Sequence, residues 1–578
     1  MNKQIESVVN TLRAGQKSEV FIEIVAACAA WLKLTHDNKL DDNQRFTGEA
    51  SIKELINILN DCVEVNFSPD KWKIEDQMLT KLLNSLNDLI KAKVVTFHEL
   101  SIAIKQLLAS QNHQLGTLIV PNEITELGAS FIGSNINSVY CPYGSGAEFA
   151  ESFPESVEKF GETNNESEVF YAAIHGLLND KTFNLESSDP IYSPSYIGEG
   201  GLRQFDASIS MPPFGLKIKA SQINDIWGRF PEQSLMGEVY FLRHMLAQTT
   251  QTVVCFVSNG FLFRTSAGEK QFKQDMIANN WVKAVVALPS HLLPNTSVPI
   301  SALILDKQNT ADMITFIDAS GEEFSDKSSR TRSKLVNTDK IMNALHSKDD
   351  TQISVRVSAK QVIANDYNLS PARYVLSEDE KALAQFLASH QTAKLEDLVD
   401  IIRPQAVKHD DVGVERFTEY NVSNLNDIGQ ISKLGKVVNV LKNDLNRAEK
   451  QTIQQNDVLV VCKGAVGKVG VVETQLGSNA IASQAFSILR VKPHINSITP
   501  TALFQYLNSK YGQLQLASLV TGTTALMLSA KDLSSMLIPL LPENKIQQAN
   551  QVRTSVIEAF KQIEQAKLQI KTLNEDYL

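Results

Sequence analysis

Apolar residues have helical spacing over much of the first 110 residues. The clearest examples are Val20, Ile22, Ile24, Val25, Cys28 and Leu32, followed by Leu79, Leu82, Leu83, Leu86, Leu89 and Ile90. This spacing places apolar side chains on one face of a helix. The pattern therefore predicts a helical N-terminal domain over residues 1–112.

From about residue 115 to 320 the pattern changes to short apolar runs separated by helical stretches. The runs are SVYCPYG, FDASISMPPFG, TVVCFVSNGFLF, VKAVVALP, ISALILDK and MITFIDAS. Strands that alternate with helices build a mostly parallel sheet, which binds ligands at the C-terminal ends of its strands. We therefore expect an α/β domain over residues 113–380, in which the charged, Ser-rich stretch 321–350 forms a loop followed by a surface helix.

A third domain is expected over residues 381–542, after a linking helix within 376–394. Its β-branched residues are interrupted by Gly464, Gly467 and Gly470, which is typical of strands joined by turns. Residues 543–578 contain neither Gly nor Pro and form a heptad seam: Ala549, Val552, Val556, Ala559, Ile563, Ala566, Ile570, Leu573 and Tyr577. The seam predicts a long helix that pairs with a second chain as a coiled coil or packs on its own domain.

Composition narrows the class of protein. With 578 residues, 43% hydrophobic and 21% charged, the chain fits a globular protein of several domains. Its five scattered cysteines include no CxxC pair, which argues against a zinc ribbon or a disulfide framework and indicates a reducing cytoplasm. We expect no signal peptide and no membrane anchor, because the N-terminus is polar and no apolar run is long enough.

Charge is unevenly distributed along the chain. The net charge is −10, but residues 431–510 hold ten basic and four acidic residues, a local charge of +6 that leaves −16 for the remainder. A basic segment of this kind is suited to DNA phosphates. Overall acidity therefore does not exclude a DNA-binding protein.

Two motifs carry candidate chemistry. The first is Tyr140 to Gly146, in which an apolar strand runs into the turn Gly144-Ser145-Gly146. Glycines at such a turn let backbone N–H groups approach a nucleotide-like cofactor, although a Gly-Ser-Gly turn also serves as a plain tight connection. The second is Met211-Pro212-Pro213-Phe214, whose prolines fix the backbone so that Phe214 either stacks on an extrahelical base or simply ends the strand.

In this order and spacing, the two motifs resemble those of adenine-N6 DNA methyltransferases, in particular the modification subunit of type I restriction-modification systems. The stretches GTLIVPNEITEL, FGETNNESEVFYAAIHGLLN and VVALPSHLLPNTSVPISALIL resemble further segments of that family. The resemblance implies a Rossmann-like fold that uses S-adenosylmethionine. It makes Met211, Pro212, Pro213 and Phe214 the catalytic candidates, and it implies these cofactor-binding residues: Pro121, Glu123, Tyr140, Gly144, Ser145, Gly146, Glu162 (ribose) and Asp189 (near adenine).

Residues 395–575 resemble half of a type I specificity subunit, with one target-recognition domain and one spacer helix. The chain is therefore identified as a modification subunit fused to a half-length specificity subunit. Its partners would be double-stranded DNA, a second copy or a specificity-like subunit bound through the C-terminal helix, and a nuclease or helicase subunit. The candidate DNA-binding residues are Lys433, Lys436, Lys463, Lys468 and Gln484.

The sequence departs from the family pattern at both motifs. Met211 stands where Asn, Asp or Ser accepts a hydrogen bond from the adenine amino group, and a thioether is a weak acceptor. Tyr140 and Tyr143 replace an acidic and a small residue, and Glu148 stands where Phe is usual. Two functions stay open from the sequence: a working methyltransferase, or an inactive scaffold that reads DNA for partner subunits.

Overall fold

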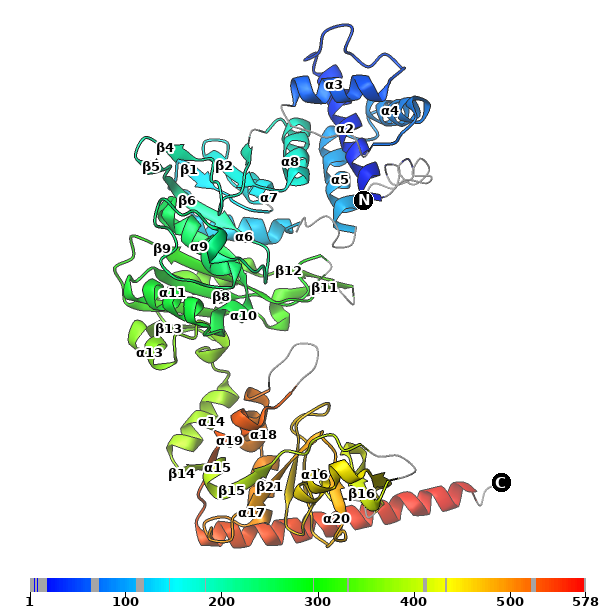
Figure 1. Cartoon of the computed structure of the whole chain (residues 1–578), viewed down its shortest axis with the longest axis vertical. Coiled ribbons are helices and arrows are strands. Elements are labelled where there is room, and N and C mark those ends of the chain that lie inside the picture. Colours follow the sequence, from blue (N-terminus) through cyan, green and yellow to red (C-terminus); the bar gives the residue numbers. More distant parts are fainter. Residues whose placement is uncertain are drawn as a thin grey trace. The chain divides into compact units, whose positions relative to one another are not determined.

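The computed structural model describes residues 18–63, 72–110, 119–144, 146–181, 183–294, 296–329, 332–408, 413–431, 434–520 and 527–575, together with Ile5 and Val8. The chain forms two compact units, Met1–Val375 and Leu376–Leu578 (Figure 1). Ser145 and Lys433, both predicted to lie in functional sites, fall outside the described residues. No helix in the described parts of the chain is long and apolar enough to cross a membrane.

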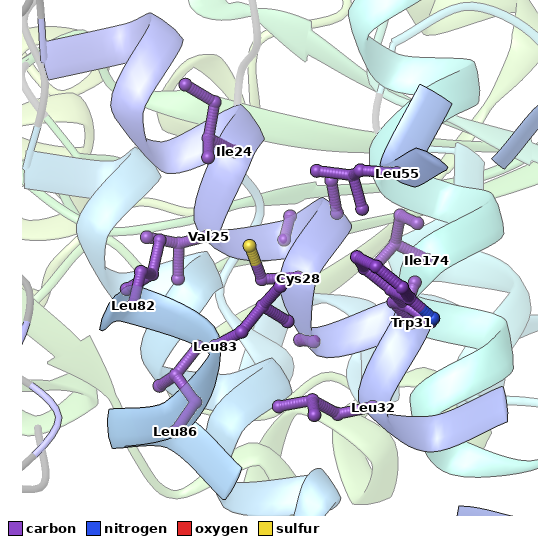
Figure 2. Close-up of a cluster of buried hydrophobic side chains, with 14 of the residues drawn as sticks. Ile24, Val25, Cys28, Trp31, Leu32, Leu55, Leu82, Leu83, Leu86 and Ile174 are labelled. Carbon is purple, nitrogen blue, oxygen red and sulfur yellow. The ribbon is translucent and has the colours of Figure 1, made fainter. Parts of the chain in front are cut away.

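The first unit begins with a helical bundle, as predicted. Its helices are α2 (Ser18–His36), α3 (Ile52–Cys62), α4 (Asp76–Lys91) and α5 (Phe97–Ser110). Every residue from Ile24 to Leu34 of α2 is buried, because this helix is apolar on nearly all sides and lies at the centre of the bundle. Figure 2 shows Val25, Cys28 and Leu83 converging in that core.

A helix from beyond the bundle completes its core. Phe170, Ile174 and Leu178 of α8 (Glu166–Asn179) belong to the same apolar cluster as α2 and α5. Lys33 of α2 also donates a hydrogen bond to Asp180, directly after α8, at 2.8 Å. The predicted boundary at residue 112 therefore separates side chains that share one core.

A nine-stranded sheet forms the centre of the α/β region, with the strand order β13-β10-β8-β9-β7-β6-β1-β2-β3. The strands are β1 (Ser138–Tyr140), β2 (Glu158–Thr163), β3 (Asn184–Ser187), β6 (Phe205–Ser210), β7 (Thr249–Ser258), β8 (Val282–Ala287), β9 (Ile300–Asp306), β10 (Met313–Asp318) and β13 (Ser354–Ser358). Neighbours from β3 to β7 are parallel, β9 runs antiparallel to β7 and β8, and β13 runs antiparallel to β10. The expected mostly parallel α/β sheet is confirmed.

Alternation along β7 shows how the sheet divides two cores. Val254 and Phe256 join one buried apolar cluster, whereas Val253 and Cys255 join the other, because successive side chains of a strand point to opposite faces. The remaining helices of this unit are α6 (Asn122–Ile132), α7 (Gly146–Glu151), α9 (Gly237–Ala247), α10 (Asn259–Phe263), α11 (Ala267–Ala278), α12 (Thr338–His346) and α13 (Ala359–Ala364).

Short antiparallel pairs lie outside the main sheet. They are β4 (Ile197–Gly198) with β5 (Gly201–Leu202), and β11 (Ser325–Ser329) with β12 (Arg332–Leu335). The second pair corrects the prediction of a plain loop before α12, since every second residue of β12 is buried and its polar residues hide that alternation.

The second unit has three small sheets, ordered β15-β21-β18-β19, β17-β16-β20 and β14-β22. Their strands are β14 (Thr392–Lys394), β15 (Val399–Ile402), β16 (Glu415–Tyr420), β17 (Lys436–Val440), β18 (Val458–Val461), β19 (Val469–Val471), β20 (Ala480–Ala482), β21 (Phe486–Val491) and β22 (Leu537–Pro539). The shorter helices are α14 (Glu378–Ala388), α15 (Leu395–Leu398), α16 (Leu445–Lys450), α17 (Pro500–Asn508), α18 (Lys510–Ser518) and α19 (Ala530–Ser534).

The unit ends in α20 (Glu543–Glu575), the predicted long helix (Figure 1). Ile546 and Ala549 pack against the apolar core of the unit, and Arg553 is buried. Beyond residue 560 every side chain described is exposed, including those of Ile563 and Ile570 on the seam. The helix is confirmed, and its pairing with a second chain stays a prediction.

Candidate cofactor and target-base site

The C-terminal ends of β1, β2, β3 and β6 surround a cavity of about 350 Å³, here called the strand-end cavity. Its lining includes Tyr143, Gly144, Thr163, Asn164, Asn165, Glu168, Asp189, Pro190, Ile191, Tyr192, Pro213, Leu216, Lys217, Ile218 and Phe241. Parallel α/β sheets bind ligands at this edge, and the volume is in the range of small-molecule sites. Three predicted site residues, Gly144, Asp189 and Pro213, meet in it.

In the glycine turn after β1, close packing against backbone excludes a side chain at Gly146. A Cβ on Gly146 would lie 2.5 Å from the Cys141 carbonyl oxygen, and one on Gly144 would lie 2.9 Å from Oε1 of Glu168. The non-glycine residue before the turn, Tyr143, has φ of 65° in the left-handed region. The turn therefore requires glycine at position 146 because a Cβ there would overlap the Cys141 backbone.

Tyr143 forms an apolar wall of the strand-end cavity. Its ring lies 4.5 Å from that of Phe241, and its hydroxyl donates to the Phe241 carbonyl oxygen at 3.3 Å. Burial raises the pKa of this phenol well above its ordinary value. The side chain is therefore neutral and suited to contact with a flat or apolar ligand group.

Tyr140 has a different role from the one predicted, because it does not line the strand-end cavity. Its ring is fully buried and stacks on Phe205 at 4.9 Å, in a cluster with Phe160 and Tyr196. Side chains alternate along β1, so the Tyr140 side chain packs in the cluster on one face of the sheet. The backbone that follows Tyr140 turns toward the cavity. The sequence pattern alone does not distinguish these two directions.

Glu162, the predicted ribose-binding carboxylate at the end of β2, is 0% exposed. One oxygen accepts a hydrogen bond from the Tyr140 hydroxyl, and the other accepts from Ser188 Oγ at 2.6 Å and from the Ser195 N–H at 2.7 Å. Burial opposes its ionisation, but the nearby His244 and the hydrogen bonds from Ser188, Ser195 and Tyr140 outweigh that effect and hold the pKa of Glu162 below its ordinary value. The carboxylate is thus occupied inside the protein.

His244 and Arg229 extend this network. His244 Nε2 lies 2.8 Å from the Tyr140 hydroxyl, and Arg229 Nη1 lies 2.8 Å from His244 Nδ1. Burial lowers the pKa of His244, so its neutral form accepts from Arg229 at Nδ1 and donates from Nε2. Arg229 also donates to the carbonyl oxygens of Pro190 and Ile191, both at 2.8 Å. The network therefore fastens the loop after β3 to the sheet.

Asp189 lies on that fastened loop and lines the strand-end cavity. One of its carboxylate oxygens accepts from the Ile191 N–H at 2.9 Å, and the other accepts from the Asn164 amide at 2.7 Å. The side chain is held in one direction while remaining partly exposed. Asp189 therefore presents a fixed carboxylate to the cavity, and its role beside a cofactor stays a prediction.

Pro121 and Glu123 line a separate groove of about 660 Å³, bounded by α5, α6, α7, α8 and β12. The groove also contains Lys105, Glu148 and Arg332. Glu148 is half-buried, and burial raises its pKa. The structure therefore places the segment before the glycine turn beside Glu148, and neither Pro121 nor Glu123 lines the strand-end cavity.

The four residues after β6 are divided between core and cavity. Met211 is 1% exposed and belongs to the apolar core, while Pro213 is exposed and lines the cavity. Phe214 is half-buried and packs against the same core as Met211. Ser210 Oγ donates to the Pro142 carbonyl oxygen at 2.6 Å, which ties this segment to the one after β1. The two motifs are therefore neighbours, but Met211 presents no polar side-chain atom there.

Glu168 was missed by the sequence reasoning. It lies in the first turn of α8, accepts a hydrogen bond from Thr163 Oγ1 at 2.8 Å, and lines the strand-end cavity. Burial raises the pKa of its carboxyl to about 7. Its signal was a polar strand, EKFGET, followed by the N-cap Asn165, neither of which the apolar pattern reveals.

In the second unit the predicted DNA-binding residues lie on two sheets. Lys436 is exposed on β17, whereas Lys463 donates to the Gln484 side chain at 3.2 Å beside β18 and β21. Lys468 donates to the Leu425 carbonyl oxygen at 3.1 Å, so its ammonium group holds a loop within the unit. The structure brings Lys463 and Gln484 together and assigns Lys468 a structural contact.

Comparison with known proteins matches both units to families. Residues 103–382 match the N-6 DNA methylase family, and residues 389–572 match the type I restriction modification DNA specificity domain. The chain therefore joins an N-6 DNA methylase domain to a type I DNA specificity domain, as its motifs indicated.

The relatives are consistent with this assignment. The type I restriction enzyme MpnII methylase subunit of Mycoplasma pneumoniae is 26% identical and covers 39% of this chain. The MjaVII methylase subunit of Methanocaldococcus jannaschii is 24% identical and covers 57%. The chain spans 44% and 64% of the lengths of these two relatives. The crystal structure of a type I methyltransferase subunit from Streptococcus thermophilus matches 65% of this chain and 99% of its own, with a TM-score of 0.51 and 17% identity, which establishes the shared fold.

Proposed function

We propose that this protein is a site-specific adenine-N6 DNA methyltransferase that uses S-adenosylmethionine and carries its own target-recognition domain. The observation that supports this proposal is the strand-end cavity, where the glycine turn, the loop of Asp189 and the Pro212-Pro213 segment meet. A glycine turn can approach a cofactor closely, and a rigid proline pair can position a flipped base at the same sheet edge.

The residues around the cavity fit the cofactor. Gly144 places backbone without a side chain at the cavity wall, and Asp189 and Glu168 offer acceptors for hydroxyl or amino groups. When bound, S-adenosylmethionine supplies the methyl group. The protein supplies a shaped, partly apolar cavity that limits access of water.

The target base would be held by the segment after β6. The two prolines fix the backbone, so its carbonyl groups are oriented without an entropic penalty, and Phe214 is the candidate for stacking on the base. Met211 contributes neither a strong acceptor nor a charge. We therefore expect methyl transfer to be slow compared with an enzyme that has Asn at this position, by about 10²–10³.

The test uses the full-length protein expressed in a host that lacks adenine methylation. N6-methyladenine in the host DNA is measured by mass spectrometry and mapped by sequencing, and S-adenosylmethionine binding is measured by calorimetry. Wild type is compared with Met211→Asn, and Met245→Asn, at a buried site on α9 outside the cavity, controls for polar insertion. We expect methylation at one sequence motif, increased in Met211→Asn only.

Cofactor binding without methylation in wild type and in Met211→Asn would contradict the proposal. It would favour an inactive scaffold that reads DNA for partner subunits. Activity that appears only in Met211→Asn would locate the loss of chemistry at this single side chain.

DNA recognition is assigned to the second unit. Replacing Lys436 and Lys463 with Ala should weaken DNA binding and reduce the slope of log K against log salt by about 0.9 for each phosphate that the variant no longer neutralises. Lys545→Ala on α20 is the matched control, because Lys545 is exposed, as Lys436 is, but lies far along the chain from both lysines. Unchanged affinity and slope in the double variant would contradict this assignment.

The exposed seam of α20 is the proposed site for a second recognition domain. One specificity domain reads only half of a bipartite site, so we propose that a second copy, or a specificity-like subunit, binds this helix. A nuclease or helicase subunit would be a further partner of the assembled complex. The exposed Ile563, Ile570 and Leu573 support the pairing because isolated apolar seams gain stability by association.

A further inference from the structure

The carboxylate of Glu162, at the end of β2, is not available to a ligand. Both oxygens of Glu162 have hydrogen-bond donors within the protein, namely Tyr140, Ser188 and Ser195. Turning this side chain toward the strand-end cavity would break those hydrogen bonds and take the carboxylate acceptor from the fully buried Tyr140 hydroxyl. Glu162 therefore acts as a structural anchor for the loop after β3.

Glu168 lies on the other side of the glycine turn. Its Oε1 lies against Gly144, and its Oε2 accepts from Thr163 Oγ1. It lines the strand-end cavity and also a smaller cavity beneath the turn, beside Tyr143 and Gly146. Among the described residues that line the strand-end cavity, only Asp189 and Glu168 carry carboxyl groups, and both oxygens of Asp189 accept local hydrogen bonds.

We propose that Glu168 is the residue that accepts hydrogen bonds from the ribose hydroxyl groups of the cofactor, and that Glu162 positions the loop opposite it. This inference rests on the proposed function, because it names a contact of the same cofactor. A ribose diol needs a hydrogen-bond acceptor, and Oε1 of Glu168 offers one beside the glycine turn. The raised pKa of Glu168 is consistent with a carboxyl that lacks a cationic partner.

The experiment measures how much affinity each variant loses when a ribose hydroxyl is removed from the ligand. S-adenosylhomocysteine and its 2′-deoxy and 3′-deoxy analogues are titrated by calorimetry into the full-length wild type, Glu168→Gln, Glu162→Gln and Glu166→Gln. Glu166 is the matched control, since it lies on the same helical turn but is exposed. Wild type and Glu166→Gln should bind at least one deoxy analogue about 10 to 100 times more weakly, the range for a hydrogen bond to a charged group.

In Glu168→Gln, binding of S-adenosylhomocysteine should weaken by a similar factor, and the penalty for the deoxy analogue should largely disappear. Glu162→Gln should have a lower melting temperature but keep the penalty. The inference is overturned if Glu168→Gln still discriminates as wild type does, or if a folded Glu162→Gln loses discrimination.

The two proposals fail in different ways. Absence of S-adenosylhomocysteine binding in wild type would overturn both the proposed function and this contact. Binding in wild type with unchanged discrimination in Glu168→Gln would overturn only the contact and leave the methyltransferase proposal intact.

Discussion

Each unit contains a buried arginine that holds neighbouring elements together, and the two arginines do so through different sets of hydrogen bonds. Arg229 donates to two carbonyl groups, to Asp225 and to His244, and so belongs to a network that continues to Glu162. Arg553 of α20 donates to Glu473 and to the Ile428 carbonyl oxygen, both at 2.6 Å. Its Nη2 has no hydrogen-bond partner within the described part of the chain.

The difference concerns what each element must do. The Arg229 network anchors Pro190 and Ile191, which line the strand-end cavity, and nearly every donor in it is matched to an acceptor. Arg553 holds the first turns of α20 against the unit, and its guanidinium lies 4.5 Å from the centre of the Phe504 ring. Beyond these turns the helix is exposed. We therefore expect loss of Arg229 to lower the free energy of unfolding more than loss of Arg553 does.

Loss of the Arg229 network should have the largest effect on stability. We expect Arg229→Met to destabilise the first unit by about 3–5 kcal/mol, because it leaves buried polar groups without partners. Calorimetry of the full chain measures the change in the transition of that unit. Arg203→Met, at an exposed arginine with a 3.8 Å ion pair to Glu158, should change stability by less than about 1 kcal/mol. Equal effects of the two variants would contradict this expectation.

Acidification should act on the same network through His244. Burial places its folded pKa below the ordinary 6.5, so the unfolded chain takes up the proton first and stability is lost as the pH falls below 6.5. The slope is at most about 1.4 kcal/mol per pH unit for one proton. Glu162, with a lowered pKa, should contribute only below 4.5.

The measurement is the pH dependence of unfolding of the first unit between pH 7 and 4.5, for wild type and His244→Gln. Comparing the two removes the opposite contribution of Glu168, whose raised pKa of about 7 favours folding at low pH. His244→Gln should have the shallower slope. Parallel profiles would show that His244 does not gain its proton on unfolding.

Arg553→Met should destabilise the second unit by about 1–2 kcal/mol, the size of a charge-assisted hydrogen bond at a partly exposed partner. Hydrogen exchange should then increase in the first turns of α20 and in the loop of Ile428. The change should be smaller than that of Arg229→Met. A larger destabilisation by Arg553→Met than by Arg229→Met would contradict this comparison.

The smallest effect on stability should come from substitutions in the exposed seam of α20 after Arg553. Replacing Ile563 and Ile570 with Ser should alter unfolding of the isolated chain by no more than about 0.5 kcal/mol, because both side chains are exposed. Sedimentation velocity should show loss of self-association in that variant. Replacing Lys561 and Glu564 with Ser, off the seam, is the control. Association that survives seam removal would contradict pairing through α20.

Sequence patterns predicted the elements whose burial is regular. The strands of the six apolar runs and the helices α2, α4 and α20 are all present, because apolar residues alternate or recur where one face is buried. Strand β2 was not predicted, since Glu158 to Thr163 includes charged and polar residues that become buried only through neighbours distant in the chain.

The site was predicted in part for a similar reason. Gly144 and Pro213 stand out from the sequence because turn geometry and proline rigidity are local properties, whereas Asp189 was a candidate only through the family resemblance. The burial of Glu162 depends on Tyr140, Ser188 and His244, which are separated by up to 104 positions along the chain. No local pattern indicates whether a carboxylate at a strand end faces its ligand or its own loop.

The sharing of α8 has a consequence for how the chain is made. Translation delivers α2 to α5 first, yet Phe170, Ile174 and Leu178 of their core emerge some 60 residues after α5 ends. The bundle therefore stays incomplete on the ribosome until β1 and β2 have followed. A polypeptide truncated at residue 112 would expose the apolar surface that α8 covers, so chaperone contact during synthesis should last until the glycine turn has already been made.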